Sequence, residues 1–321
     1  MENASKIIKW AEEILLSQGC IIKSAPEDVQ ITPWSNVKRI LTSDGYIYLK
    51  QMPPKLYLEP IITQILYDSF HANVPQVIAT NKDLNCFLTK GSGIPLREIF
   101  KNNFQSNLLC QGIKKYTYIQ RSAVEHVTTF LELGVPDWRL EKLPILYTQL
   151  ISNEDILIDD GMTSDEISLL YKLHPKFSAI CELLSKYKIP ETLDHGNFND
   201  NNILIEDNTN HMTIIDWAET VITHPFFSLV YCLRNAAARY GFKETDKTYL
   251  ELQDACVQDW LGFEERTKLL EAFSLAKRLW PIYDSLGEYR LMMSSNAVEF
   301  KSLNRHGRLS LGFHEWIKIE K

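Results

Sequence analysis

The most constraining feature of this sequence is a polar loop that leads into a short hairpin and ends at a carboxylate. The loop reads His-Gly-Asn-Phe-Asn-Asp-Asn-Asn over residues 195–202, and an Ile-Leu-Ile run follows it. A second apolar run ends at Asp216. Two such runs separated by turn residues predict a β-hairpin, with strands over 201–206 and 211–216 and the turn at 207–210.

The hairpin brings two oxygen-bearing side chains to one end. Antiparallel strands return to the end from which they start, so Asn202 and Asp216 converge there. An amide oxygen and a carboxylate are hard ligands of the kind that Mg²⁺ takes, and two protein ligands leave positions for phosphate oxygens. The spacing therefore predicts Asn202 and Asp216 as ligands of a magnesium ion that a nucleotide shares.

Composition argues against several classes of function. The chain has 321 residues, and its hydrophobic share of 45% is ordinary for a globular protein that buries a core without disulfides. Its 34 Lys and Arg against 41 Asp and Glu give a net charge of −7. Without a basic tract this argues against a nucleic-acid partner. No apolar run reaches about 18 residues, and the first residues lack a secretion signal, so we expect no membrane partner and a cytoplasmic location.

The pattern along the chain changes near residue 91. Before this point we expect helices over 3–18 and 59–70, and short strands near 29–31, 37–41, 45–51, 76–80 and 86–88. After it we expect mainly helices, over 95–102, 116–134, 164–186, 224–240, 247–258 and 264–296. The expected fold class is α+β. A small lobe with an antiparallel sheet and a leading helix covers residues 1–91, and a larger helical lobe with the loop and the metal site covers 92–321.

The loop and hairpin together resemble the aminoglycoside phosphotransferase and choline kinase-like family, which is related to the protein kinases. That family carries H-G-D-x-x-x-x-N, then a hairpin and an I-D-W or I-D-F element. The matching residues, in type and spacing, are His195, Gly196, Asn202 and Asp216-Trp217. The resemblance covers roughly residues 30–240. It implies a protein-kinase-like fold of two lobes, with ATP and Mg²⁺ as cofactors.

The resemblance also assigns nucleotide contacts in the first lobe. Lys50 resembles the lysine of the third strand, and Glu59 resembles its partner on the first large helix. Ser35 falls in the short turn that covers the phosphates, while Thr89 and Gly91 fall at the hinge that contacts adenine. Three of these residues also have a plain structural reading: Lys50 as a surface lysine, Glu59 as an acid at a helix start and Ser35 as an ordinary turn residue.

Position 197 departs from the resembled pattern. The family has an aspartate there that accepts the proton of the substrate hydroxyl, and this chain has Asn197. An amide cannot act as a base near neutral pH, although it can orient a hydroxyl. Three explanations stay open: a natural pseudoenzyme, a slow enzyme that works by positioning and charge stabilisation, or an altered form of an active enzyme. Asp200 is a weaker candidate for a substitute base, and we expect His195 to hold the loop backbone.

The sequence predicts a phosphotransferase that moves the γ-phosphate of ATP to a hydroxyl of a small molecule, such as an aminoglycoside-like antibiotic or an amino-alcohol. The alternatives are a nucleotide-binding regulatory module and a kinase that acts on protein. We expect a monomer or a homodimer. Acidic contacts for a cationic acceptor, which also fit solvated helix faces, are Glu219, Asp254, Asp259, Glu264, Glu265 and Glu288. An aromatic wall, which also fits the core, would comprise Trp260, Trp280, Tyr283 and Tyr289.

Overall fold

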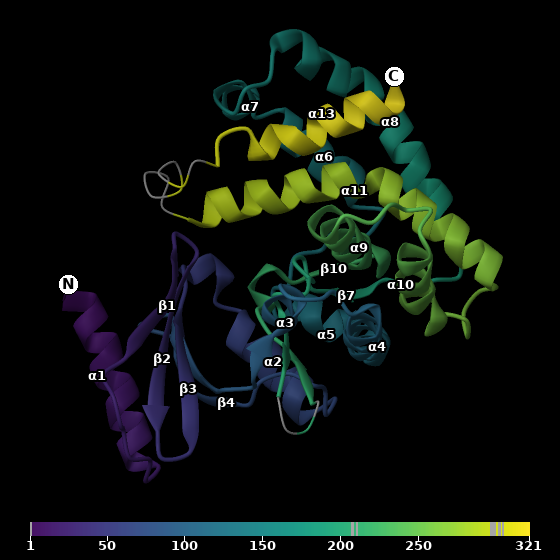
Figure 1. Cartoon of the computed structure of the whole chain (residues 1–321). Helices are drawn as coiled ribbons and strands as arrows, with labels where there is room; N and C mark the ends of the chain where they lie inside the picture. The colour runs from purple at the N-terminus through teal and green to yellow at the C-terminus, as the bar shows by residue number, and fades with distance from the viewer. Residues whose placement is uncertain (1, 207–208, 210, 296–299, 301–302, 304) are drawn as a thin grey trace.

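A five-stranded antiparallel sheet forms the small lobe of the chain (Figure 1). The structure, a computed structural model, describes residues 2–206, 209, 211–295, 300, 303 and 305–321. The strands are β1 (Glu27–Thr32), β2 (Ser35–Thr42), β3 (Gly45–Gln51), β4 (Val77–Asn81) and β5 (Cys86–Lys90). Their spatial order is β1-β2-β3-β5-β4, so β3 lies at the centre.

Helix α1 (Glu2–Ser17) covers one face of this sheet. Its residues Ile7, Ala11 and Leu15 recur every four positions and form one buried cluster with Ile47 and Leu49 of β3. In Figure 1 the helix lies on the side of the sheet away from the helical lobe. Side chains alternate along a strand, so the residues between and beside Ile47 and Leu49 point toward the helical lobe instead.

The rest of the small lobe links the sheet to the helices. A 3-10 turn, η1 (Pro54–Leu56), precedes helix α2 (Glu59–Asp68). Pro60 stands in the first turn of α2, where its missing N–H costs little. Glu59 begins the helix, and its side chain is buried, so it is held in one place rather than solvated.

The larger lobe is mostly helical and surrounds the loop. Its helices are α3 (Leu96–Phe100), α4 (Ser106–Ala123), η2 (Val124–His126), α5 (Val127–Glu132), α6 (Leu143–Ile151), α7 (Glu154–Asp159), α8 (Ser164–Leu184), η3 (Trp217–Glu219), α9 (Phe226–Tyr240), α10 (Lys247–Gln258), α11 (Arg266–Ser294) and α13 (Arg308–Glu320). Its short strands are β6 (Ile94–Pro95), β7 (Thr192–Asp194), β8 (Ile203–Ile205), β9 (Met212–Ile214) and β10 (Val221–Thr223). Helix α11 runs through this lobe beside α13, α9 and α8 (Figure 1).

The α+β class with two lobes is confirmed, and so are the two strands of the hairpin, β8 and β9, which pair antiparallel. Of the expected turn at 207–210, only Thr209 belongs to the described residues. Among the described helices, none has the length and apolar character needed to cross a membrane.

One expected helix, over 116–134, is wrong in its bounds. Helix α4 already begins at Ser106, because Leu109, Ile113 and Tyr116 continue one buried stripe toward the N-terminus. A 3-10 turn then interrupts the helix before α5. The sequence analysis also did not predict α6, α7 and α13. Helix α13 packs so closely on α11 that a Cβ at Gly312 would lie 2.1 Å from the carbonyl oxygen of Pro281.

Candidate active site

The loop begins at a buried anchor at the end of β7. Asp194 is inaccessible to solvent and accepts hydrogen bonds from the hydroxyl of Tyr283 at 2.7 Å and from the backbone N–H of Gly196 at 3.1 Å. The hydroxyl of Tyr116 and the backbone N–H of Ser228 also donate to it, each at 3.2 Å. A fully buried carboxylate needs such donors, and here they fix the start of the loop to helices α4, α9 and α11.

His195 contacts the backbone on both sides of its ring. Its Nδ1 accepts from the N–H of Asn197 at 3.2 Å, and its Nε2 lies 2.9 Å from the carbonyl oxygen of Ile215. Burial lowers the pKa of His195 to about 4, so the ring is neutral at pH 7 and Nε2 is the protonated nitrogen that donates to Ile215. The histidine therefore ties the loop to the end of the hairpin.

Two left-handed backbone positions shape the site. Gly196 has φ 79°, and a Cβ there would lie 2.5 Å from the carbonyl oxygen of Glu219. Asp216 has φ 70° although it is not glycine. This conformation turns the chain sharply after β9 into η3, which then packs directly on Gly196.

Lys50 joins the two lobes. Its Nζ lies 2.6 Å from Oε2 of Glu59 and 2.5 Å from Oδ1 of Asp216. Burial alone would lower the pKa of Lys50, but the two carboxylates outweigh burial and raise it above its ordinary value. Burial would likewise raise the pKa of Asp216, yet the Lys50 ammonium holds it below its ordinary value. At neutral pH the lysine is charged, and the aspartate is an anion.

Asn202 lies beside this ion cluster, at the start of the hairpin. It is buried, its Nδ2 donates to the carbonyl oxygen of Asn197 at 2.9 Å, and its own carbonyl oxygen accepts from Ile215 at 3.0 Å. The amide nitrogen is thus engaged with the loop, which leaves Oδ1 as the atom that a cation would use. Within the described residues, no group of three or more His, Cys, Asp or Glu side chains is gathered as a metal site.

The other expected nucleotide contacts lie further along the sheet. Ser35 is buried, and its Oγ has no hydrogen-bond partner among the described atoms. Thr89 pairs with Tyr48 across β3 and β5, two positions from Lys50 and on the same face of the sheet. Gly91 donates to the carbonyl oxygen of Tyr46 at 2.8 Å, and a Cβ at Gly91 would lie 2.7 Å from that oxygen. No hydrogen bond or ion pair among the described residues joins these three to Lys50.

Comparison with known sequences identifies a related family. The sequence model of the phosphotransferase enzyme family, APH, matches residues 162–271, the segment that holds the loop and the hairpin. The resemblance to this family is confirmed. Among curated protein sequences, no match to the chain is found.

Solved structures of such phosphotransferases share the protein-kinase-like fold. Plasmodium vivax ethanolamine kinase aligns with a TM-score of 0.58 at 11% identity, over 87% of this chain and 84% of its own. A macrolide 2'-phosphotransferase type I aligns with a TM-score of 0.57 at 12% identity, over 94% and 96%. A choline/ethanolamine kinase family protein from Mesorhizobium loti aligns with a TM-score of 0.56 at 14% identity, over 93% and 94%. At these identities the comparison shows the fold.

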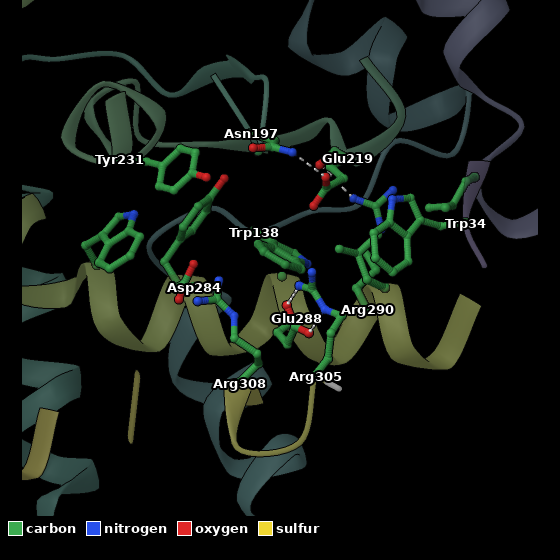
Figure 2. Close-up of a pocket in the computed structure, with 16 residues that line it drawn as sticks. Trp34, Trp138, Asn197, Glu219, Tyr231, Asp284, Glu288, Arg290, Arg305 and Arg308 are labelled. Carbon is green, nitrogen blue, oxygen red and sulfur yellow. Dashed lines mark hydrogen bonds and ion pairs between the residues drawn. The ribbon is translucent and has the colours of Figure 1, made fainter. Parts of the chain in front are cut away.

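A cavity of about 150 Å³ opens beside Asn197 of the phosphotransferase-like loop (Figure 2). Five aromatic side chains line it: Trp34, Trp138, Tyr231, Trp280 and Tyr283. Trp34 comes from the turn between β1 and β2, so the small lobe supplies part of the wall. Of the expected aromatic wall, Trp280 and Tyr283 are present, while Trp260 is fully buried in the core and Tyr289 lies outside the lining.

The charged lining of the cavity is mixed in sign. Three acids and three arginines face it: Glu219, Asp284, Glu288, Arg290, Arg305 and Arg308. Arg305 donates to Glu288 through Nε, at 2.7 Å, and through Nη2, and its guanidinium lies 4.9 Å from the ring centroid of Trp34. Arg290 donates to the backbone carbonyl oxygens of Glu219 and Thr220, at 2.9 and 3.0 Å. These two cations are therefore already engaged by the protein.

Four of the acids expected around the acceptor lie elsewhere. Asp254 pairs with Arg266, Asp259 accepts from the Thr117 hydroxyl, and Glu264 pairs with Lys268. Glu265 precedes α11 and does not line the cavity. The sequence analysis missed the arginines of the lining because they lie beyond the resembled segment and carry no local pattern.

Proposed function

We propose that this chain is an ATP-dependent phosphotransferase that moves the γ-phosphate to a hydroxyl of a small molecule. The observation that carries the proposal is the meeting of Lys50, Glu59 and Asp216 next to the loop of Asn197. Three side chains from different parts of the chain form one ion cluster there, beside a cavity, in a fold that solved phosphotransferases share.

The nucleotide would lie between the lobes, 1–91 and 92–321. Lys50 would bind the α- and β-phosphates, and Glu59 would hold the lysine in place. The free Oγ of Ser35 supports a phosphate contact, because a buried hydroxyl without a partner is costly unless a ligand satisfies it. Thr89 and Gly91, at the end of β5, would lie at the hinge that contacts adenine.

Asn202 and Asp216 fit a partial site for Mg²⁺. The Asp216 carboxylate is charged, the Asn202 amide has its nitrogen engaged, and both sit at one end of the hairpin. Two protein oxygens suit an ion that takes its remaining ligands from phosphates and water. When bound, the ion would neutralise charge that develops on the transferring phosphoryl group.

The remaining loop residues position the reaction. His195 and Gly196 hold the loop against the hairpin, and Asn197 faces the cavity, where it would orient the acceptor hydroxyl. Catalysis of phosphoryl transfer depends mainly on such positioning and on charge stabilisation.

The acceptor would be a small hydroxylated molecule such as an amino-alcohol. The cavity of about 150 Å³ is small beside the 300–1,000 Å³ that is typical of drug-sized ligands, which favours an amino-alcohol over a whole aminoglycoside. The aromatic walls and the carboxylate of Asp284 suit an ammonium group.

A second candidate function is a nucleotide-binding regulatory module. Asn197 favours it, because an amide at this position removes the base that the resembled family uses. The two candidates bind nucleotide alike and differ in turnover.

The test combines binding with turnover. Calorimetry with a non-hydrolysable ATP analogue, with and without Mg²⁺, should show Mg²⁺-dependent binding. ADP release should then rise when a pool of ethanolamine, choline, an aminoglycoside and a macrolide is added. Binding without any turnover would favour the regulatory module, and the absence of binding would contradict both candidates.

A further inference from the structure

The side chain of Asn197 is bonded to a carboxylate. Its Nδ2 donates to Oε1 of Glu219 at 3.0 Å, and its Oδ1 accepts from Nδ2 of Asn199 at 2.9 Å. The two contacts require a donor on one side and an acceptor on the other, which is what an amide provides. An aspartate at position 197 would instead face the Glu219 carboxylate with a like charge.

Glu219 is held in this position by the backbone around it. Arg290 donates to the carbonyl oxygens of Glu219 and Thr220, and the Cβ of Glu219 lies so close to Gly196 that no side chain fits between them. Figure 2 shows the Glu219 carboxylate beside Asn197 at the wall of the cavity. Among the described residues no hydrogen bond reaches its other oxygen, Oε2, so this oxygen is available to a bound hydroxyl.

The other carboxylates near the loop are engaged or distant. Asp200 accepts from Arg97 and Tyr240, so it braces the loop rather than serving as a base. Glu288 is paired with Arg305. Asp284 lies on α11 at the opposite wall, near Arg308, in Figure 2.

We propose that Glu219 is the general base of this site, in place of the aspartate that position 197 lacks, and that Asn197 positions the acceptor hydroxyl against it. This inference rests on the proposed function. As the acceptor oxygen bonds to the γ-phosphorus of ATP, the bond from that phosphorus to the ADP oxygen breaks. The hydroxyl proton moves to the Glu219 carboxylate, which later releases it to solvent.

The electrostatics of Glu219 suit this role. Burial raises its pKa to about 7, and the nearby Asp216 adds to the rise, while the hydrogen bond from Asn197 and the charge of Arg290 oppose it. A base is most effective when its pKa lies near the working pH. The side chain reaches the cavity, so the proton it accepts has a path to water.

The test exchanges the two side chains. Glu219→Gln removes the base, while Asn197→Asp together with Glu219→Gln places the carboxylate at 197 and the amide at 219, so their hydrogen bond persists with its direction reversed. Rates of ADP release would be measured with Mg-ATP, with water alone and with the pool of ethanolamine, choline, an aminoglycoside and a macrolide. Glu132→Gln, an exposed glutamate at the end of α5, is the matched control.

We expect Glu219→Gln to lower kcat by about 10²–10⁴-fold, the usual contribution of a positioned base, with unchanged affinity for the ATP analogue. The exchanged pair should recover to within about tenfold of the original chain, since a factor of ten is only 1.4 kcal/mol of barrier. Glu132→Gln should keep its rate.

Two results would contradict the assignment of Glu219 as the base while leaving the proposed function intact. One is turnover that Glu219→Gln does not lower. The other is an exchanged pair that binds the ATP analogue normally but remains as slow as Glu219→Gln, because a carboxylate moved across the shared hydrogen bond should recover the rate if this pair supplies the base. Binding of the analogue without turnover in any form, the original chain included, would overturn the proposed function and the base together.

Discussion

The ammonium of Lys50 and the carboxylate of Asp216 form an ion pair of 2.5 Å across 166 residues of sequence. One partner lies on the central strand of the small lobe, and the other ends the hairpin of the large lobe. Because Glu59 touches the same ammonium, one cation is shared by two carboxylates. Any change here alters both the stability of the lobes' contact and the charge that a nucleotide would meet, and the two effects can be separated by choice of variant.

Lys50→Met should weaken nucleotide binding and also destabilise the fold. The substitution leaves the Glu59 carboxylate buried without its partner, and breaking a buried ion pair costs about 3 kcal/mol. Urea unfolding would report the loss of stability, and calorimetry with an ATP analogue would report the loss of affinity.

Adding Glu59→Gln to this variant separates the two effects. The neutral amide removes one of the two charges that lose Lys50, so the free energy of unfolding should recover in part while the nucleotide affinity stays low. Recovery of the affinity in the double variant would contradict a phosphate-binding role for Lys50 and leave it a purely structural residue.

Asp216→Asn should abolish the dependence of nucleotide binding on Mg²⁺. The substitution removes the charged ligand, while Lys50 keeps Glu59 as its partner, so the fold should survive. We expect the affinity for the ATP analogue in Mg²⁺ to fall by at least about tenfold, or 1.4 kcal/mol. Asp68→Asn, an exposed carboxylate at the end of α2, is the control and should bind as the original chain does. Equal Mg²⁺ dependence in both variants would show that Asp216 is not a ligand of the metal ion.

The parts of the site that the sequence predicted are those with short-range patterns. The loop, the two strands of the hairpin and the first helix each carry a local signal of turn residues, alternation or helical spacing. Lys50 and Glu59 are nine residues apart, and their pairing followed from the resemblance rather than from periodicity. The structure places them in contact.

The cavity could not be predicted in this way. The guanidinium of Arg305 stacks on Trp34, which comes from the other lobe and 271 residues earlier in the sequence. The left-handed turn at Asp216, which returns Glu219 to the loop, could not be predicted from the sequence either. Aspartate rarely adopts that conformation, and the neighbouring residues carry no signal for it. These contacts depend on the tertiary arrangement of the two lobes.

Acidification should destabilise the chain partly through His224. This residue is buried, its Nδ1 accepts from the N–H of Phe226, and burial lowers its pKa to about 3. The pKa of an unfolded histidine is about 6.5, so below that pH the unfolded state binds the extra proton and the folded state does not. Stability conferred by the neutral ring is therefore complete above pH 6.5 and is lost as the pH falls toward 3.

The variant His224→Asn isolates this effect, since the side-chain oxygen of the introduced asparagine can still accept a hydrogen bond from the N–H of Phe226. Between pH 7 and pH 5 the original chain should lose about 2 kcal/mol more of its free energy of unfolding than the variant, which is 1.5 pH units below 6.5 at 1.4 kcal/mol each. Urea unfolding at the two pH values measures the difference. Parallel losses in both chains would show that His224 is not the buried neutral group.

Gly196→Ala should disable the site through the backbone. The residue has φ 79°, and an added Cβ would lie 2.5 Å from the carbonyl oxygen and 2.9 Å from the Cβ of Glu219. The left-handed conformation costs a residue with a side chain about 1–2 kcal/mol, and the clash must displace η3. Moving Glu219 away from the loop breaks its bond with Asn197, so turnover should fall together with stability.

Gly262→Ala is the control for this substitution. Gly262 has no positive φ, and a Cβ there meets nothing within 4 Å, so stability should stay within about 0.5 kcal/mol of the original. Thermal unfolding and ADP release would be followed for both variants. Normal turnover in Gly196→Ala would mean that η3 can retreat without consequence, and the contact of Glu219 with the loop would then have no part in the reaction. The geometry of the loop predicts that Gly196→Ala loses more turnover than its loss of stability explains. It predicts no such loss in Gly262→Ala.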